Sequence, residues 1–173
     1  MLRRLRTRPS LDLPTGLALL TGLALLTLSG PAQAKDLGGR LAVGANLSLG
    51  SVPALSVRYG LPTGNPAINV QLEALGGYWA PAGGPASLTA GGRVLYGVVA
   101  EDNMNLFLGV GAGVDEQAGL TAFRVQPTMG ADFFFFGLEN LGFTAEWGVN
   151  VDLGDASGSS TSATLGAGVH YWF

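Results

Sequence analysis

Alternation of apolar and polar residues with a period of two most restricts how this chain can fold. From Ala163 to Phe173, the odd positions carry Ala, Leu, Val, Tyr and Phe, whereas the even positions carry Thr, Gly, His and Trp. A period of two places successive side chains on opposite faces of a β-strand. The segment therefore predicts a strand with one continuously apolar face.

The same alternation recurs along the chain, and no helical period separates the segments. Glycine, proline and asparagine clusters divide them, as expected for turns. The predicted strands cover residues 40–49, 55–59, 67–79, 87–99, 105–114, 123–133, 141–152 and 161–173. Eight strands joined by short turns predict a closed antiparallel up-and-down β-barrel. Pro127 interrupts the sixth strand, and proline cannot donate to a ladder, so we expect a bulge or frayed pairing there.

Alternation alone also fits a soluble β-sandwich or a lipocalin-like barrel. The position of charge separates these alternatives, because the charged residues of the predicted strands fall on the polar face. On that face lie Arg58, Glu73, Arg93, Arg124, Asp132, Glu146, Asp152 and His170. A charge facing lipid near mid-membrane costs about 2–4 kcal/mol. Charged residues make up 12% of the chain, against about a quarter in soluble domains. We therefore expect a transmembrane barrel with its apolar face toward lipid.

The N-terminus has the three parts of a secretory signal peptide. Four arginines lie within residues 1–8, an apolar run covers residues 17–28, and Ala32 and Ala34 form an Ala-x-Ala site. A membrane-spanning anchor is the alternative, but it needs about 20 apolar residues. We expect cleavage after Ala34, which divides the chain into a signal peptide (1–34) and a barrel (35–173). The chain contains no cysteine, so neither a lipid anchor nor a disulfide is expected.

The last strand, with Tyr171 and Phe173 on its apolar face, resembles the C-terminal signal of bacterial outer-membrane β-barrels. Residues 35–173 as a whole resemble the small OmpA/OmpX-type barrels. The resemblance implies a Gram-negative outer membrane, contact with its lipids, and engagement of the last strand by the barrel assembly machinery. We expect no peptidoglycan-binding domain after Phe173, so a wall-tethering role is not implied. The expected outer loops, around 50–53, 78–87, 115–121 and 153–161, are shorter than those of adhesins and receptors.

Aromatic residues on the apolar face indicate which end of the predicted barrel lies at the periplasmic interface. If Lys35 lies in the periplasm, one set of rings on the apolar face falls near that end of the strands. The set comprises Tyr59, Tyr96, Phe133 and Phe143, together with Tyr171 and Phe173. Aromatic rings concentrate at membrane interfaces, so these residues predict a periplasmic aromatic belt. The opposite belt is sparser, with Phe123 and either Tyr78 or Trp79.

The inward charges predict a polar plug. Arginines and acids share the inner face, and the proposed network comprises Arg58, Glu73, Arg93, Arg124, Asp132 and Glu146. An eight-stranded barrel is just wide enough for side chains to fill, so paired charges should block a continuous water path. A narrow pore for small solutes is the alternative.

Other chemistry has little support in the sequence. His170 is the sole histidine; some eight-stranded barrels are lipid-modifying enzymes that use a histidine, but a core hydrogen bond is expected here rather than a general base. Acids outnumber bases, which argues against nucleic acid. Asp152 and Asp155 could hold a hard cation, although a solvated loop is expected. We predict no catalytic, cofactor or metal site, and a structural or surface-interaction role with an unidentified partner at the outer loops.

Overall fold

The computed structural model describes residues 35–50, 52–65, 68–154 and 158–173. The expected signal peptide and its cleavage after Ala34 lie outside these residues. The strands are β1 (Leu41–Asn46), β2 (Ala54–Gly60), β3 (Asn69–Trp79), β4 (Ser87–Glu101), β5 (Met104–Gln117), β6 (Leu120–Phe134), β7 (Leu141–Gly154) and β8 (Gly158–Trp172). Within the described ranges, no helix has the length and apolar character needed to cross a membrane.

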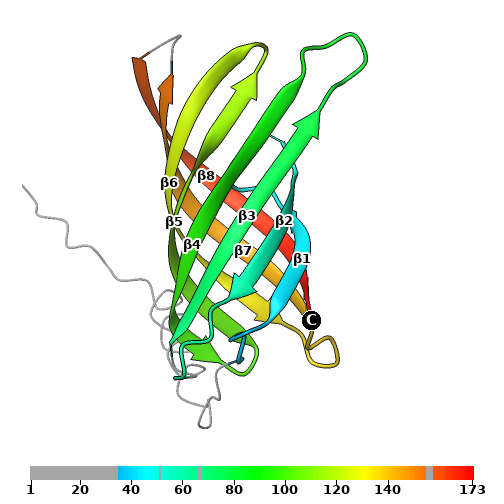
Figure 1. Ribbon diagram of the computed structural model, residues 1–173, viewed down its shortest axis with the longest axis vertical. Coiled ribbons are helices and arrows are strands. Elements are labelled where there is room, and N and C mark those ends of the chain that lie inside the picture. The colour runs from blue at the N-terminus through cyan, green and yellow to red at the C-terminus, as the bar shows by residue number, and fades with distance from the viewer. Residues whose placement is uncertain (1–34, 51, 66–67, 155–157) are drawn as a thin grey trace, which may run out of the picture. The chain divides into compact units, whose positions relative to one another are not determined.

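The strands form one closed barrel, in which each pairs antiparallel with its sequence neighbours and β8 pairs with β1 (Figure 1). This confirms the expected all-β, closed, eight-stranded antiparallel architecture. We call the end where β1 begins and β8 ends the lower end, as drawn in Figure 1, and the end with the β3–β4, β5–β6 and β7–β8 hairpins the upper end. β1 and β2, of 6 and 7 residues, are much shorter than the 15-residue strands β4, β6 and β8.

The alternation divides the barrel wall as the sequence predicts. Val110, on the outer face of β5, is 53% exposed, whereas Arg93, on the inner face of β4, is 3% exposed. The outer face carries large apolar side chains on every strand, and charged side chains in mid-strand, such as Arg58, Glu73 and Arg93, lie on the inner face. This inside-out pattern follows from the period of two, because each strand turns every second side chain toward the axis.

Leu49 is an exception to this pattern, and its expected position on the outer apolar face is wrong. It is 2% exposed and packs with Ala54 and Leu75 inside the barrel. β1 ends at Asn46, and the chain after Leu47 turns inward instead of continuing the strand to residue 49. Ser48 N–H donates to Asn46 Oδ1 over 2.8 Å, which fixes this turn.

Two irregularities interrupt the ladders. β6 keeps one register with β7 on both sides of Pro127, but the pairs that Gln126 and Pro127 should make are missing. The expected frayed pairing is therefore confirmed, and there is no bulge.

In β4 the register against β5 shifts between Gly97 and Val99. Val98 and Val99 consequently both lie exposed on the outer face, which strict alternation did not predict.

The lower end of the barrel is closed by apolar side chains. Leu37, just before β1, packs with Ala42, Phe134 and Trp172, all almost fully buried. Arg40 secures the segment, because its Nη2 donates to Asn140 Oδ1 over 2.8 Å and to the Trp172 carbonyl over 3.1 Å. The N-terminal segment therefore seals one opening of the barrel with hydrophobic contacts.

Candidate functional site

Five of the six charged residues expected inside the barrel form one connected network. Arg93, on β4, lies between two carboxylates: its Nε donates to Glu73 Oε2 over 2.9 Å, and its Nη1 donates to Glu146 Oε1 over 2.8 Å. Arg58, on β2, approaches Glu73 Oε1 at 3.2 Å and Asp132 Oδ1 at 2.9 Å. Strands far apart in sequence are thus joined across the axis by ion pairs.

Neutral side chains complete this network. Asn46 and Ser56 donate to Glu73 Oε1, and Thr144 donates to Asp132 Oδ1 over 2.6 Å. All three are buried. Because a buried carboxylate needs several donors to offset its desolvation, these contacts explain how Glu73 is held between two guanidinium groups.

Arg124 is the sixth expected member, and it does not join this network. Its Nε donates to Asp152 Oδ1 over 2.6 Å, its Nη2 donates to Asp152 Oδ2 over 3.0 Å, and its Nη2 lies 3.4 Å from Asp115 Oδ2. The sequence predicts a loop at Asp115, but β5 continues to Gln117 and carries Asp115 into the wall, where Thr89 donates to it. A second, partly exposed charge cluster therefore lies nearer the upper end.

The start of the connection after β1, Ser48 and Leu49, enters the upper interior and is held there by three side chains. Arg93 Nη1 donates to Ser48 Oγ over 2.8 Å, Arg124 Nη1 donates to the Leu49 carbonyl over 2.8 Å, and Gln126 Nε2 donates to the Ser48 carbonyl over 2.6 Å. Ser48 and Leu49 are both buried. The obstruction in the upper interior is thus a piece of main chain as well as a set of ion pairs.

Inward glycines make room for this connection. A Cβ on Gly91 would lie 2.5 Å from Leu49 Cδ2, and one on Gly113 would lie 3.2 Å from the same atom. On the opposite wall, a Cβ on Gly166 would lie 2.6 Å from Ser48 Cβ. The glycine-rich inner faces of β4, β5 and β8 therefore fit residues 48–49.

His170 makes a buried hydrogen bond, as expected. Its Nε2 lies 2.8 Å from Ser56 Oγ and 3.6 Å from Glu73 Oε1. Serine, histidine and acid thus meet, but the acid approaches the same ring nitrogen as the serine. In a catalytic triad the acid binds the opposite nitrogen and orients the ring, whereas Nδ1 of His170 has no hydrogen-bond partner among the described residues. The geometry is that of a packed polar core.

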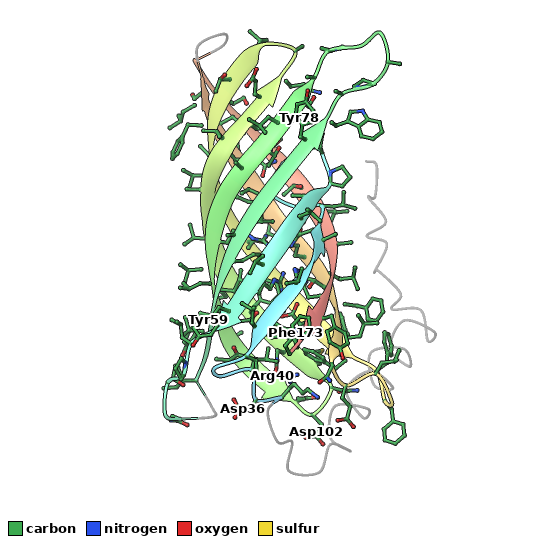
Figure 2. All side chains as sticks on the ribbon, turned by 45° about the vertical axis from the view of Figure 1, so that its right-hand side comes forward. Asp36, Arg40, Tyr59, Tyr78, Asp102 and Phe173 are labelled. Carbon is green, nitrogen blue, oxygen red and sulfur yellow. The ribbon has the colours of Figure 1, made fainter. Side chains whose placement is uncertain are left out.

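The aromatic residues gather on the outer face toward the lower end. Tyr59, Tyr96, Phe133 and Tyr171 are exposed, and Phe143 is half-buried. Ring contacts link this group: Tyr171 and Phe173 lie 5.1 Å apart between centroids, and Phe143 lies 5.3 Å from Phe135. Figure 2 shows Tyr59 and Phe173 near the lower end and Tyr78 near the upper end. Phe135 and Phe136, in the β6–β7 connection, are also exposed, although the alternation did not place them in the predicted belt.

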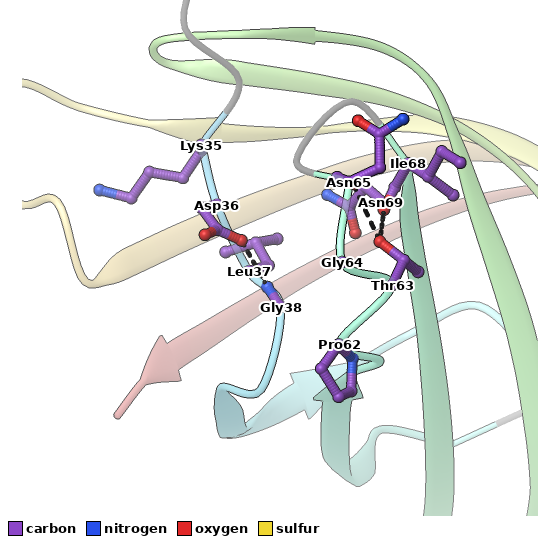
Figure 3. Close-up of a pocket in the computed structure, with 10 residues that line it drawn as sticks. All are labelled: Lys35, Asp36, Leu37, Gly38, Pro62, Thr63, Gly64, Asn65, Ile68 and Asn69. Atoms are coloured by element: carbon purple, nitrogen blue, oxygen red, sulfur yellow. Dashed lines mark hydrogen bonds between the residues drawn. The ribbon is translucent and has the colours of Figure 1, made fainter.

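A pocket of about 290 Å³ lies outside the polar interior, between the segment before β1 and the β2–β3 connection (Figure 3). Its polar groups are largely engaged with one another: Asp36 Oδ1 accepts from Gly38 N–H over 2.9 Å, and Thr63 Oγ1 donates to the Ile68 carbonyl over 2.7 Å. No group of three or more histidines and acids suited to a metal ion occurs in the parts of the chain described.

Comparisons with known proteins supply no relative. No protein-family profile matches the chain, and no match was found among curated proteins or solved structures. The barrel and its interior are therefore interpreted from their own geometry.

Proposed function

We propose that the chain is a non-enzymatic integral barrel of a bacterial outer membrane, with a structural or surface-interaction role. The observation that carries the proposal is the outward apolar face. Large side chains such as Val110, Met129 and Trp147 are about half exposed in mid-strand, while the charged residues of the Arg93 network are buried inside. A water-soluble barrel would leave this surface unfavourably hydrated, whereas lipid favours it.

Two further features support the same proposal. The aromatic group at the lower end fits an interfacial belt, because aromatic rings favour the boundary between acyl chains and water. The basic, apolar and Ala-x-Ala pattern of residues 1–34 fits export. In this orientation the lower end faces the periplasm, and the exposed Tyr171 side of β8 would engage the assembly machinery.

The blocked interior favours a structural or interaction role over conduction. Leu37 and Trp172 close the lower end, the network around Arg93 crosses the middle, and residues 48–49 occupy the upper part. The upper hairpins are then the parts available to a partner outside the cell. They present exposed Tyr78 and Trp79 on β3 and Leu120 on β6.

Expression of the full chain in a Gram-negative host tests the proposal. The protein should fractionate with the outer membrane, require detergent for extraction, and begin at Lys35 after processing. Unboiled samples should migrate faster than boiled ones on a denaturing gel, because a closed barrel resists unfolding by detergent. Release into the soluble fraction without detergent would contradict the proposal.

Planar-bilayer recording separates the proposed role from the narrow pore. The blocked interior should give no steady openings. Steady, solute-sized conductance from the purified barrel would favour the pore instead.

A further inference from the structure

The upper half of β8 has one unpaired edge. On the β7 side, β8 pairs along its whole length, from Gly158 to Tyr171. On the β1 side, pairing runs only from Gly168 to Trp172, and Leu47 N–H adds one hydrogen bond of 3.0 Å to the Ala167 carbonyl. No described strand pairs with residues 158–166 on that side. Figure 1 shows the short β1 and β2 ending well below the hairpins beside them.

An exposed strand edge is a template for pairing, and soluble proteins protect such edges with charges or proline. Residues 158–166 contain neither. Leu165 is 82% exposed, far more than Val169 (38%) and Tyr171 (47%) on the same face of β8. In lipid, the unpaired backbone groups beside Leu165 would also lack any hydrogen-bond partner. Pairing with another strand would satisfy these backbone groups and cover Leu165.

The ladder already present identifies the segment that fits. β1 and β8 pair as Ala42 with Trp172 and as Asn46 with Gly168. Continued upward in the same register, Ser48 falls opposite Gly166 and Leu49 falls opposite Leu165. In such an extended segment Leu49 shares the outer face with Leu47, so it would cover Leu165. The apolar alternation of residues 41–49 suits this extended form, although Leu49 is turned inward in the structure.

A second copy of the chain is a poorer occupant. Strands in these barrels tilt by about 35–45°, and two barrels side by side in one membrane share the same up direction. Their β8 strands would then cross at a large angle and run the same way, so antiparallel pairing of the two edges is excluded. Residues 47–50 directly follow β1, which runs antiparallel to β8, and Leu47 is already hydrogen-bonded to Ala167 of β8.

We propose that the upper edge of β8 is a docking site for residues 47–50 of the same chain, which exchange between the interior and the barrel wall. Docking pairs Leu49 with Leu165, turns the Leu49 side chain to the outer face and moves the main chain of residues 48–49 into the wall, while Ser48 faces inward beside Asn46. Arg124 and Gln126 then lose their main-chain acceptors on this segment and face a cup that is open from above. The lower apolar seal remains, so the cup admits small hydrophilic solutes without becoming a through-pore.

Cysteine pairs in the full chain test this exchange, and the protein contains no native cysteine. Leu49→Cys with Leu165→Cys should form a disulfide under mild oxidation, because paired strands bring Cα atoms to about 5.5 Å, within the range for a disulfide. Leu49→Cys with Ala163→Cys is the off-register control, at a diagonal distance of about 7–8 Å. Leu49→Cys with Leu75→Cys reports the inward position.

The in-register pair should cross-link at least about tenfold faster than the off-register pair. Adding Arg124→Gln and Gln126→Ala, which removes two donors to the segment, should raise the in-register rate about tenfold further. Cross-linking through Leu75→Cys alone, with the Leu165→Cys pair no faster than its control, would overturn the proposal. Gly50→Cys with Thr164→Cys provides a second in-register pair if Leu49→Cys impairs folding.

These measurements can be made on refolded protein in detergent, so they do not depend on the proposed location. Failure to fractionate with the membrane would contradict the proposed function and leave the cross-linking result intact. Failure of the in-register disulfide in a heat-modifiable, membrane-extracted barrel would contradict only the docking site.

Discussion

Glu73 is the residue on which the interior charge network depends most. It contacts both Arg58 and Arg93, and it also accepts hydrogen bonds from Asn46 and Ser56. Its side chain is fully buried. A buried ion pair as a whole is weak evidence for stability. Removal of one partner is nevertheless strongly destabilising, because it leaves the other charge buried and uncompensated. Neutralising Glu73 therefore leaves the guanidinium groups of Arg58 and Arg93 with less compensating negative charge.

Replacement of Glu73 by Gln should lower the free energy of unfolding by about 3–5 kcal/mol, because Arg58 and Arg93 keep their charge in the buried interior. Urea titration of the refolded barrel, followed by the heat-modifiable gel shift, measures the change. Glu139→Gln is the matched control, since Glu139 is exposed in the β6–β7 connection, and it should change stability by less than about 0.5 kcal/mol. Equal free energies of unfolding for the two variants would show that the network does not depend on Glu73.

Two glycines on opposite faces of the wall give a second residue-scale prediction. A Cβ on Gly166 would lie 2.6 Å from Ser48 Cβ and 2.7 Å from Glu146 Oε1, whereas a Cβ on Gly76 would meet nothing within 4 Å. Gly166→Ala should destabilise the barrel by about 1–3 kcal/mol through overpacking, and Gly76→Ala should be neutral. The same unfolding titration compares them. A tolerated Gly166→Ala would mean that residues 48–49 move readily out of the way.

At the scale of elements, β6 contains the weakest part of a ladder. Pro127 pairs with Val110 of β5 but makes no pair with β7. The adjacent Gln126 compensates in part, because its Nε2 donates to Asn150 Oδ1 over 2.8 Å across the gap. A side-chain bond thus replaces backbone bonds where proline prevents them.

Pro127→Val should restore the missing pair with β7 and stabilise the barrel by about 0.5–1.5 kcal/mol, the net value of a hydrogen bond. Position 127 lies exposed on the outer face, so valine fits there without repacking the interior. The measurements are the unfolding midpoint and the hydrogen-exchange rate of residues 126–128. Unchanged exchange at these amides would show that the gap has another cause.

The existence of the strands and the direction of their faces could be predicted from sequence, because both follow from local alternation. The end of β1 could not. Residues 48–49 turn inward through contacts with Arg93, Arg124 and Gln126, which lie 45, 75 and 78 positions away along the chain. Local periodicity carries no information about such partners, and it favoured the extended form instead.

The same distinction applies to the charged interior. Period two placed the six expected network residues on one face, but it could not say which acid meets which arginine. Arg124 pairs with Asp152 because these residues are directly opposite in the β6–β7 register. Asp115 could not be predicted as a strand residue, because Asp-Glu-Gln-Ala-Gly resembles a turn. In the structure the turn of the β5–β6 hairpin is formed by Ala118 and Gly119, which both have positive φ.

At the scale of the whole molecule, the outer face should tolerate charge only near the ends of the strands. Val110→Lys places a cation in mid-strand and should reduce stability in lipid vesicles by about 2–4 kcal/mol. Leu120→Lys, at the upper end of β6, should cost no more than about 1 kcal/mol. Refolding yield and unfolding in vesicles report both changes. Equal, small effects would favour a water-exposed outer face.

The position of Leu37 links the N-terminal segment to the last strand. Its socket is assembled from Ala42 of β1, Phe134 of β6 and Trp172 of β8, so the socket exists only after the first and last strands have met. Leu37 can therefore be buried only in the final step of barrel assembly. The indole of Trp172 beside it is a native fluorophore that can report when this step occurs.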